Sequence, residues 1–141
     1  MPRLRELDLL RFQNAINDVA LARLVNACIR SLEGFKLGYG GNAASLGMGP
    51  QTTVALSKCK NLKRLVLGDP EDHAKPKQLE GRLQNVKRLL NHKQFNLEYL
   101  TLYQADGYII DLLSTKAESS SLLQLTIVQY IQTRIIDENG I

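Results

Sequence analysis

A membrane-spanning helix needs an apolar run of about 20 residues, and no run in this chain comes close to that length. Residues 1–6 carry charges where a signal peptide would have its apolar core. Cysteine is scarce, with only Cys28 and Cys59, and no Asn-x-Ser/Thr glycosylation acceptor occurs. Disulfides and such acceptors are typical of secreted chains. We therefore expect an intracellular protein, cytoplasmic or nuclear, that does not associate with membranes.

Residues with catalytic or metal-binding chemistry are also few. The only histidines, His73 and His92, have no cysteines or carboxylates around them at the spacing of a metal site, and no nucleophile–base–acid set is evident. The glycine-rich run 38–42 lacks the Gly-Lys-Ser/Thr of a phosphate-binding loop. Cys28 and Cys59 could be a redox pair, but their positions at helix ends favour buried free thiols. The sequence predicts no enzyme, no metal and no cofactor.

The composition is that of one folded domain with an uneven charge. The 141 residues are 44% hydrophobic and 23% charged, which is too apolar for a disordered chain. Residues 58–93 hold ten Lys and Arg against four Asp and Glu, whereas residues 94–141 hold two against six. Such an asymmetry can steer a charged partner. The plainer alternative is that the basic residues form a solvated outer face.

One apolar motif, with the spacing Leu-x-x-Leu-x-Leu, occurs five times. The copies are Leu4-Leu7-Leu9, Leu32-Phe35-Leu37, Leu62-Leu65-Leu67, Leu97-Leu100-Leu102 and Leu122-Leu125-Ile127. Alternate side chains of a strand point to one face, so the last two apolar residues of each copy face inward. One strand cannot bury them alone, but stacked copies share a core. The central residues are thus expected on adjacent strands of one parallel sheet: Leu7, Phe35, Leu65, Leu100 and Leu125.

Between the copies the apolar spacing becomes helical. After the first copy, Asn17-Asp18 is a plausible helix start, and one predicted face holds Ile16, Ala20, Leu24 and Ala27. After the third copy, the face holds Leu79, Leu83, Val86 and Leu90. A shorter stripe of Ile109, Leu112 and Leu113 follows the fourth copy. In the second connection, only residues 52–59 look helical. The pattern is therefore strand, loop and helix, repeated.

The five copies resemble those of leucine-rich-repeat proteins, over nearly the whole chain. Residues 16–24 are similar to the helix lead-in of the ribonuclease-inhibitor type, and residues 58–67 are similar to the F-box type. The chain departs from the family where an Asn or Cys is usual, eight residues after each first leucine; it has Phe12, Gly40, Pro70, Ala105 and Tyr130 there. The resemblance implies an α/β horseshoe-shaped solenoid of about five strand–helix repeats, with the parallel sheet on the concave face. Residues 1–141 would form one such domain, or a fragment of a longer array.

The resemblance also implies a non-catalytic protein–protein interaction module. One form of it is the substrate-recognition part of an F-box-type ubiquitin-ligase adaptor, although the three residues before Leu4 are too few to hold an F-box. The alternative is a nucleic-acid-binding or assembly scaffold protein that uses a basic helix carrying Arg82, Lys87, Arg88 and Lys93. That helix has no interleaved aromatic residues on which bases could stack, so a protein partner is favoured.

Residues between the inward-facing leucines are expected to face the concave side, where they form columns across neighbouring strands. Tyrosine and arginine often anchor interfaces, which makes Tyr103, Tyr99 and Arg64 the first candidates. The full set of candidate partner-binding residues is Tyr103, Tyr99, Arg64, Lys36, Glu6, Asp8, Val66, Thr101 and Gln124. Gly34, Gly38 and Gly68 leave room among them for a shallow pocket. The alternative is that these are merely exposed strand-forming residues.

Overall fold

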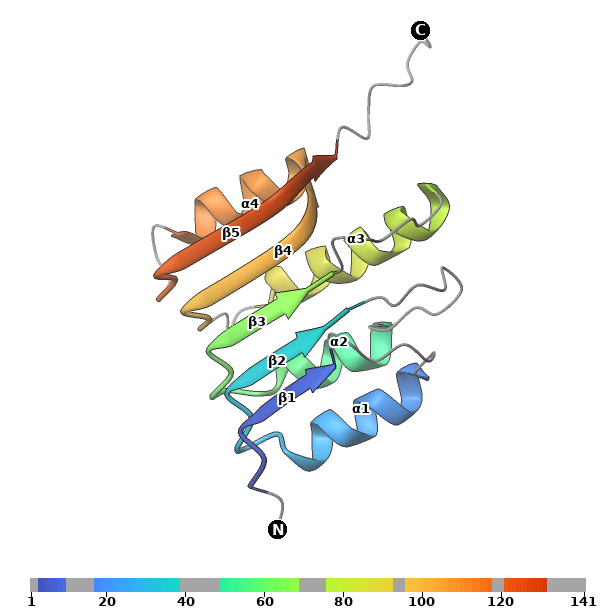
Figure 1. Ribbon diagram of the computed structural model, residues 1–141, viewed down its shortest axis with the longest axis vertical. Coiled ribbons are helices and arrows are strands. Elements are labelled where there is room, and N and C mark those ends of the chain that lie inside the picture. The colour runs from blue at the N-terminus through green and yellow to red at the C-terminus, as the bar shows by residue number, and fades with distance from the viewer. Residues whose placement is uncertain are drawn as a thin grey trace, which may run out of the picture.

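The protein has an α/β fold, and in the part of the chain that the structure describes five strands alternate with four helices (Figure 1). The computed structural model describes residues 3–9, 17–38, 49–68, 76–92, 96–117 and 121–131. The strands are β1 (Glu6–Leu9), β2 (Gly34–Leu37), β3 (Arg64–Leu67), β4 (Tyr99–Asp106) and β5 (Gln124–Ile131). The helices are α1 (Asp18–Ala27), α2 (Pro50–Ser57), α3 (Pro76–Leu90) and α4 (Gly107–Ala117).

All five strands lie in one parallel sheet, in the order β1-β2-β3-β4-β5. The register joins the central residue of every motif copy to that of the next: Leu7 to Phe35, Leu65, Leu100 and Leu125. This confirms the prediction that the five copies are neighbouring strands of one parallel sheet. The spacing of the motif therefore fixed both the pairing partners and the register.

The helices lie behind the sheet in the view of Figure 1, and the core lies between them and the strands. Consecutive parallel strands with right-handed connections, each stepping in the same direction, bring every helix to the same face. Phe35, Leu65 and Leu100 point into this core and are at most 1% exposed. Helix residues that the sequence pattern assigned to the core join them, namely Leu83, Val86, Leu90, Ile109 and Leu113.

The central motif residues of the two outer strands are less buried than predicted. Leu7 is only partly buried, and Leu125 is 40% exposed although it was expected to face a continuous core. The cause is position: β2, β3 and β4 have a strand on each side, whereas β1 and β5 have one on a single side among the described residues. No described helix follows β5, so the helix layer covers Leu125 only in part.

The predicted start of α1 is correct, but its predicted apolar face is wrong. The Asn17 side chain accepts hydrogen bonds from the backbone N–H groups of Val19 (2.7 Å) and Ala20 (3.3 Å), as an N-cap residue does. The buried residues of the helix are Leu21, Ala22 and Val25. The predicted face of Ala20, Leu24 and Ala27 is exposed, while Ile16 lies outside the described residues. The apolar residues of this segment fall on two faces of the helix. The face that packs in the core is the one that also holds Cys28.

Within the described residues, every helix is too short or too polar to cross a lipid bilayer.

Candidate partner-binding face

The helices that the structure describes all lie on one face of the sheet, and we call the opposite face the open face. It is formed by the strand residues that alternate with the buried ones. The nine candidate residues all belong to it, in three rows that run across the strands. The first row has Glu6, Gly34, Arg64, Tyr99 and Gln124, the second has Asp8, Lys36, Val66, Thr101 and Thr126, and Tyr103 belongs to the third. Of the third row, Leu10 lies outside the described residues.

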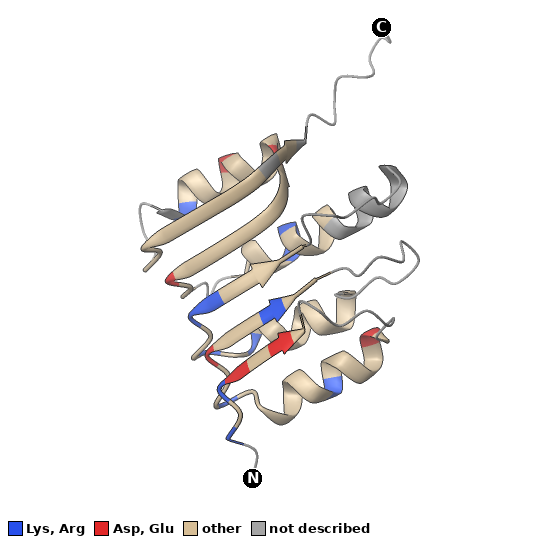
Figure 2. Ribbon diagram, in the orientation of Figure 1, with Lys and Arg blue, Asp and Glu red and all other residues tan. Residues whose placement is uncertain are grey.

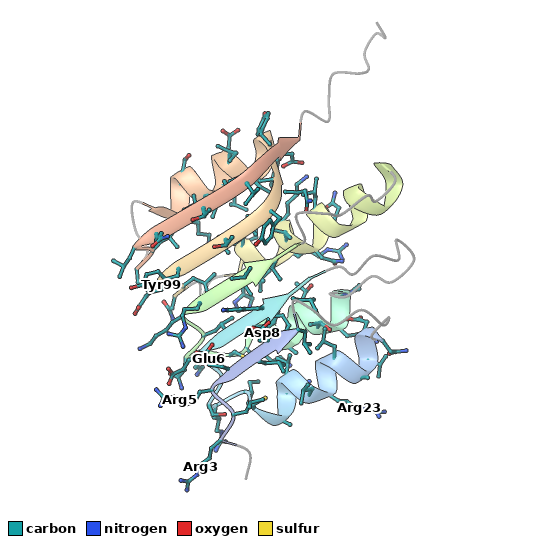
Figure 3. All side chains as sticks on the ribbon, in the orientation of Figure 1. Arg3, Arg5, Glu6, Asp8, Arg23 and Tyr99 are labelled. Atoms are coloured by element: carbon teal, nitrogen blue, oxygen red, sulfur yellow. The ribbon has the colours of Figure 1, made fainter. Side chains whose placement is uncertain are left out.

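Charged residues occupy one half of the open face. Figure 2 shows acidic residues on β1 and basic residues on β2 and β3, and in Figure 3 the labelled Glu6 and Asp8 come from β1. The Arg64 guanidinium forms an ion pair with Glu6, reaching across β2, and lies 3.9 Å from the Glu33 carboxylate. Asp8 is paired with Lys36 in the strand register. We call Glu6, Asp8, Lys36 and Arg64 the charged half.

A second ion pair lies at the N-terminal ends of the strands. Arg5 donates two hydrogen bonds to Glu33, at 3.0 and 3.1 Å, in the bidentate arrangement that suits a guanidinium and a carboxylate. This contact lowers the pKa of Glu33 and raises the pKa of Arg5. Arg5 is well exposed, so solvent weakens the pair, and its main effect is to neutralise Glu33 beside Arg64.

Gly34 and Gly68, two of the three glycines named above, do not leave the space that the sequence predicted for a shallow pocket. A Cβ atom at Gly34 would collide with the Glu6 carboxylate, so the space above this glycine is the route by which Glu6 reaches Arg64. At Gly68 a Cβ would lie 2.7 Å from the Cβ of Tyr103. Both spaces are therefore filled by side chains of the protein itself, and the prediction of a pocket at Gly34 and Gly68 is wrong.

The other half of the open face is uncharged and carries tyrosines. Tyr99 is 42% exposed at the start of β4, where Figure 3 labels it, while Tyr103 and Thr101 are partly buried beside it. On β5 the same face holds Val128 and Tyr130, which are 55% and 56% exposed. We call the set Val66, Tyr99, Thr101, Tyr103, Gln124, Thr126, Val128 and Tyr130 the tyrosine half. It offers rings and hydroxyl groups but no charge.

Short polar side chains just before three of the motif copies connect each of those repeats to the one before it. Ser31 donates to the carbonyl oxygen of Leu4 (2.8 Å), and Ser121 donates to that of Leu97 (3.2 Å). Asn61 donates to the carbonyl oxygen of Arg30 (2.8 Å). Sequence reasoning missed this role, although Ser or Asn directly before the first leucine was its visible signal. These bonds help to set the spacing of the strands, and hence of the open face.

Asp18 performs a similar task between two helices. Its carboxylate accepts hydrogen bonds from the backbone N–H groups of Gly49, Gln51 and Thr52, all at 2.9–3.0 Å, and from the Thr52 hydroxyl at 2.7 Å. Partial burial tends to raise the pKa of Asp18, but these hydrogen bonds outweigh it and lower the pKa. A Cβ at Gly49 would meet this carboxylate at 2.6 Å. The glycine thus lets α1 cap α2.

Helix α3, which the nucleic-acid alternative would use as a basic surface, presents fewer exposed cations among its described residues than the sequence predicted. Lys87 forms an ion pair with Asp106 (3.0 Å), and its ammonium lies 4.9 Å from the ring centre of Tyr108. Its side chain is only 19% exposed, so it is not the solvent-facing cation that was expected. Arg88 is exposed as predicted, whereas the side chains of Arg82 and Lys93 lie outside the described residues.

Neither cysteine offers a reactive thiol. Cys28 and Cys59 are both free and buried, as predicted, near the ends of α1 and α2. Burial raises the pKa of both thiols, and for Cys59 burial together with the neighbouring Cys28 raises the pKa to about 11. Among the residues that the structure describes, no three His, Cys, Asp or Glu side chains are grouped as metal ligands would be.

Comparison of the chain with protein-family models, curated proteins and solved structures gives no match.

Proposed function

We propose that the protein is a leucine-rich-repeat solenoid that binds a protein partner on the open face of its sheet. Two features support the family. The five motif copies coincide with five parallel strands in register, and the helices between them lie on one face only. Parallel sheets usually have helices on both faces, and repeat proteins that line a horseshoe with strands are an exception. The open face would be the concave side.

The observation that carries the binding proposal is the tyrosine half. Tyr99, Val128 and Tyr130 are each more than 40% exposed on one continuous face, although an isolated protein gains nothing from exposing apolar rings and side chains together. Tyrosine supplies a large contact area, a hydroxyl group and little rotamer entropy to lose, which makes it common in interfaces. We place the centre of the partner contact at Tyr99 and Tyr103.

The charged half would orient the partner more than hold it. Its four charged residues include two acids and two bases, and Arg64 already has Glu6 and Glu33 beside it. A partner must therefore compete with existing ion pairs, and exposed pairs contribute little energy in any case. Charges at the edge of a contact mainly affect the rate and register of association.

A more specific form of the proposal is the substrate-recognition part of an F-box-type ubiquitin-ligase adaptor, which rests on the resemblance of the motif alone. The nucleic-acid alternative would rely on exposed cations of α3 such as Arg88, but Lys87 of the same helix is not free for a phosphate. Phosphate binding needs available cations, and Lys87 is held by Asp106 at the side of the helix layer.

The proposal is tested by capture of partners from cell extract on the immobilised protein. We expect Tyr99→Ala combined with Tyr103→Ala to reduce capture of the specific partner at least tenfold, as loss of central aromatic anchors does. Tyr108→Ala is the matched control, because Tyr108 is 57% exposed but lies on α4, away from the open face. Circular dichroism checks that all variants fold.

Capture that survives the double variant, or that is lost equally with Tyr108→Ala, would place the contact elsewhere. Binding that weakens steeply as salt is raised, together with a gel shift of RNA or DNA, would favour the nucleic-acid alternative.

A further inference from the structure

The two edge strands of the sheet differ in length and in charge. β1 has four residues, of which Glu6 and Asp8 are acidic. β5 has eight residues, Gln124–Ile131, with no charged residue and no proline. Free strand edges usually avoid unwanted pairing by being short, charged or interrupted by proline. β1 has the first two of these protections, and β5 has none of the three.

β5 is also exposed on both of its faces. On the side of the helices, Leu125 is 40% exposed. Leu123, just before the strand, is 71% exposed. On the open face, Val128 and Tyr130 are 55% and 56% exposed. The strand pairs with β4 along one edge, and its other edge has no strand beside it among the described residues. Its backbone groups on that edge are thus a template for a further strand.

We propose that β5 pairs antiparallel with β5 of a second copy of this chain, about a two-fold axis perpendicular to the sheet. The two five-stranded sheets would then form one continuous sheet across two molecules. An antiparallel strand at the edge of an otherwise parallel sheet is common. The contact is closed, because the same strand is used by both copies and neither edge remains free at the junction.

Charge selects this pairing over the other ways of joining two copies. Pairing β1 with β1 would bring the carboxylates of Glu6 and Asp8 next to their counterparts in the partner, and like charges across strands destabilise a sheet. Pairing β5 with β1 would leave one unprotected β5 at the end of each assembly, so that copies would add without limit. Only β5 with β5 joins uncharged strands and closes.

The two-fold axis determines which residues meet. It keeps the faces of the two sheets on the same side, so a residue of β5 lies opposite a residue of the same face. Two registers centre on the middle of the strand: either Ile127 or Val128 lies opposite the same residue of the second copy. On the open face, Thr126 lies opposite Val128 of the second copy in the register centred on Ile127, and opposite Tyr130 in the register centred on Val128. Both are pairs of β-branched or aromatic residues, which stabilise neighbouring strands.

The dimer would be reversible, and it would not block the open face. One pair of strands buries less than the roughly 1,000 Å² of a stable interface, so association should depend on concentration. Both open faces would point to the same side of the joined sheet, with the two tyrosine halves next to the junction. A partner with two binding segments would then gain from occupying both copies.

Sedimentation equilibrium of the full chain tests the pairing. We expect the mass to rise with concentration from 15.8 kDa towards twice that value. Thr126→Lys should weaken dimerisation at least tenfold, because a lysine on the edge strand opposes pairing. Thr101→Lys is the matched control: Thr101 and Thr126 are partners in the register of β4 and β5, but β4 is an interior strand. This control should leave the dimer intact.

Disulfide trapping tests the register. Ile127→Cys and Val128→Cys are oxidised separately, and residues that face each other across antiparallel strands lie within the reach of a disulfide. The native Cys28 and Cys59 are buried and should not cross-link. A covalent dimer from either variant supports the pairing.

A monomer at every concentration, unlimited assemblies, an unchanged dimer in Thr126→Lys or the lack of any cross-link would each overturn the proposal. None of these results touches the proposed partner contact, which depends on Tyr99 and Tyr103 in a separate assay.

Discussion

Single residues of the open face have structural roles that their types do not reveal. Gly34 begins β2 and Gly68 directly follows β3, and each has a neighbouring side chain in the space that its own Cβ would occupy. At Gly34 the neighbour is the flexible end of Glu6. At Gly68 it is the Cβ of Tyr103, and the backbone has a positive φ of 113° that disfavours other residues.

The two glycines should therefore respond differently to alanine. Gly68→Ala is expected to lower the free energy of unfolding by about 1–3 kcal/mol, because it combines backbone strain with a contact that cannot move aside. Gly34→Ala should change it by less than about 1 kcal/mol, because Glu6 can swing away at the cost of an exposed ion pair. Urea denaturation measures both, and equal effects would contradict the assigned contacts.

At the scale of elements, side chains from one element complete the ends of another. Asp18 of α1 supplies the carboxylate for the first turn of α2, whose own N-cap residue, Gly49, has no side chain. A carboxylate is favoured there by the free N–H groups and by the helix dipole. In the same way, Asp106 at the end of β4 accepts a hydrogen bond from the N–H of Ile109 in α4 (3.0 Å) and pairs with Lys87 of α3.

Asp18→Asn should destabilise the protein by about 1–2 kcal/mol at neutral pH, the usual effect of losing a capping group. Because folding lowers the pKa of Asp18, its stabilising effect is fully present above the pKa of the unfolded chain. It is lost as the pH falls below about 4 and through the folded pKa. The difference between wild type and variant should therefore shrink in acid.

Thermal unfolding at a series of pH values checks this dependence. Asp111→Asn is the control, because Asp111 is an exposed acid on α4. A difference that stays constant down to low pH would show that the Asp18 carboxylate is not the group that titrates.

For the whole molecule, burial is greatest in the middle of the sheet and declines towards its edges. Leu65 on β3 is 1% exposed, whereas Leu125 on β5 is 40% exposed, although both occupy the central position of the same motif. The interior strands have a strand on both sides and helices behind them. Among the described residues, β5 has a strand on one side only, and the helices cover it in part. The repeats therefore contribute unequally to stability.

Leu65→Ala should lower the free energy of unfolding by about 2–5 kcal/mol, because it leaves a cavity in a closely packed core. Leu125→Ala should cost about 1 kcal/mol or less, because much of that side chain already faces solvent. The two are compared by denaturation at concentrations where the protein is monomeric. A large effect of Leu125→Ala under those conditions would mean that β5 is covered after all.

The sequence by itself determined the strands, their order and their register. A motif repeated five times leaves few choices, since a shift by one residue would turn every leucine away from the core. It also placed the candidate residues on one face, because side chains alternate along a strand. Those inferences depend only on local periodicity and on the need of each copy to bury the same positions.

Only the tertiary structure decided which side chains meet. The ion pair of Glu6 with Arg64 across Gly34, the reach of Asp18 to α2 and the pairing of Lys87 with Asp106 all join residues far apart in sequence. The choice of Leu21 and Val25 over Leu24 as the buried face of α1 depended on packing. Contacts of this kind follow from side-chain geometry and the position of a strand within the sheet, which no periodic pattern encodes.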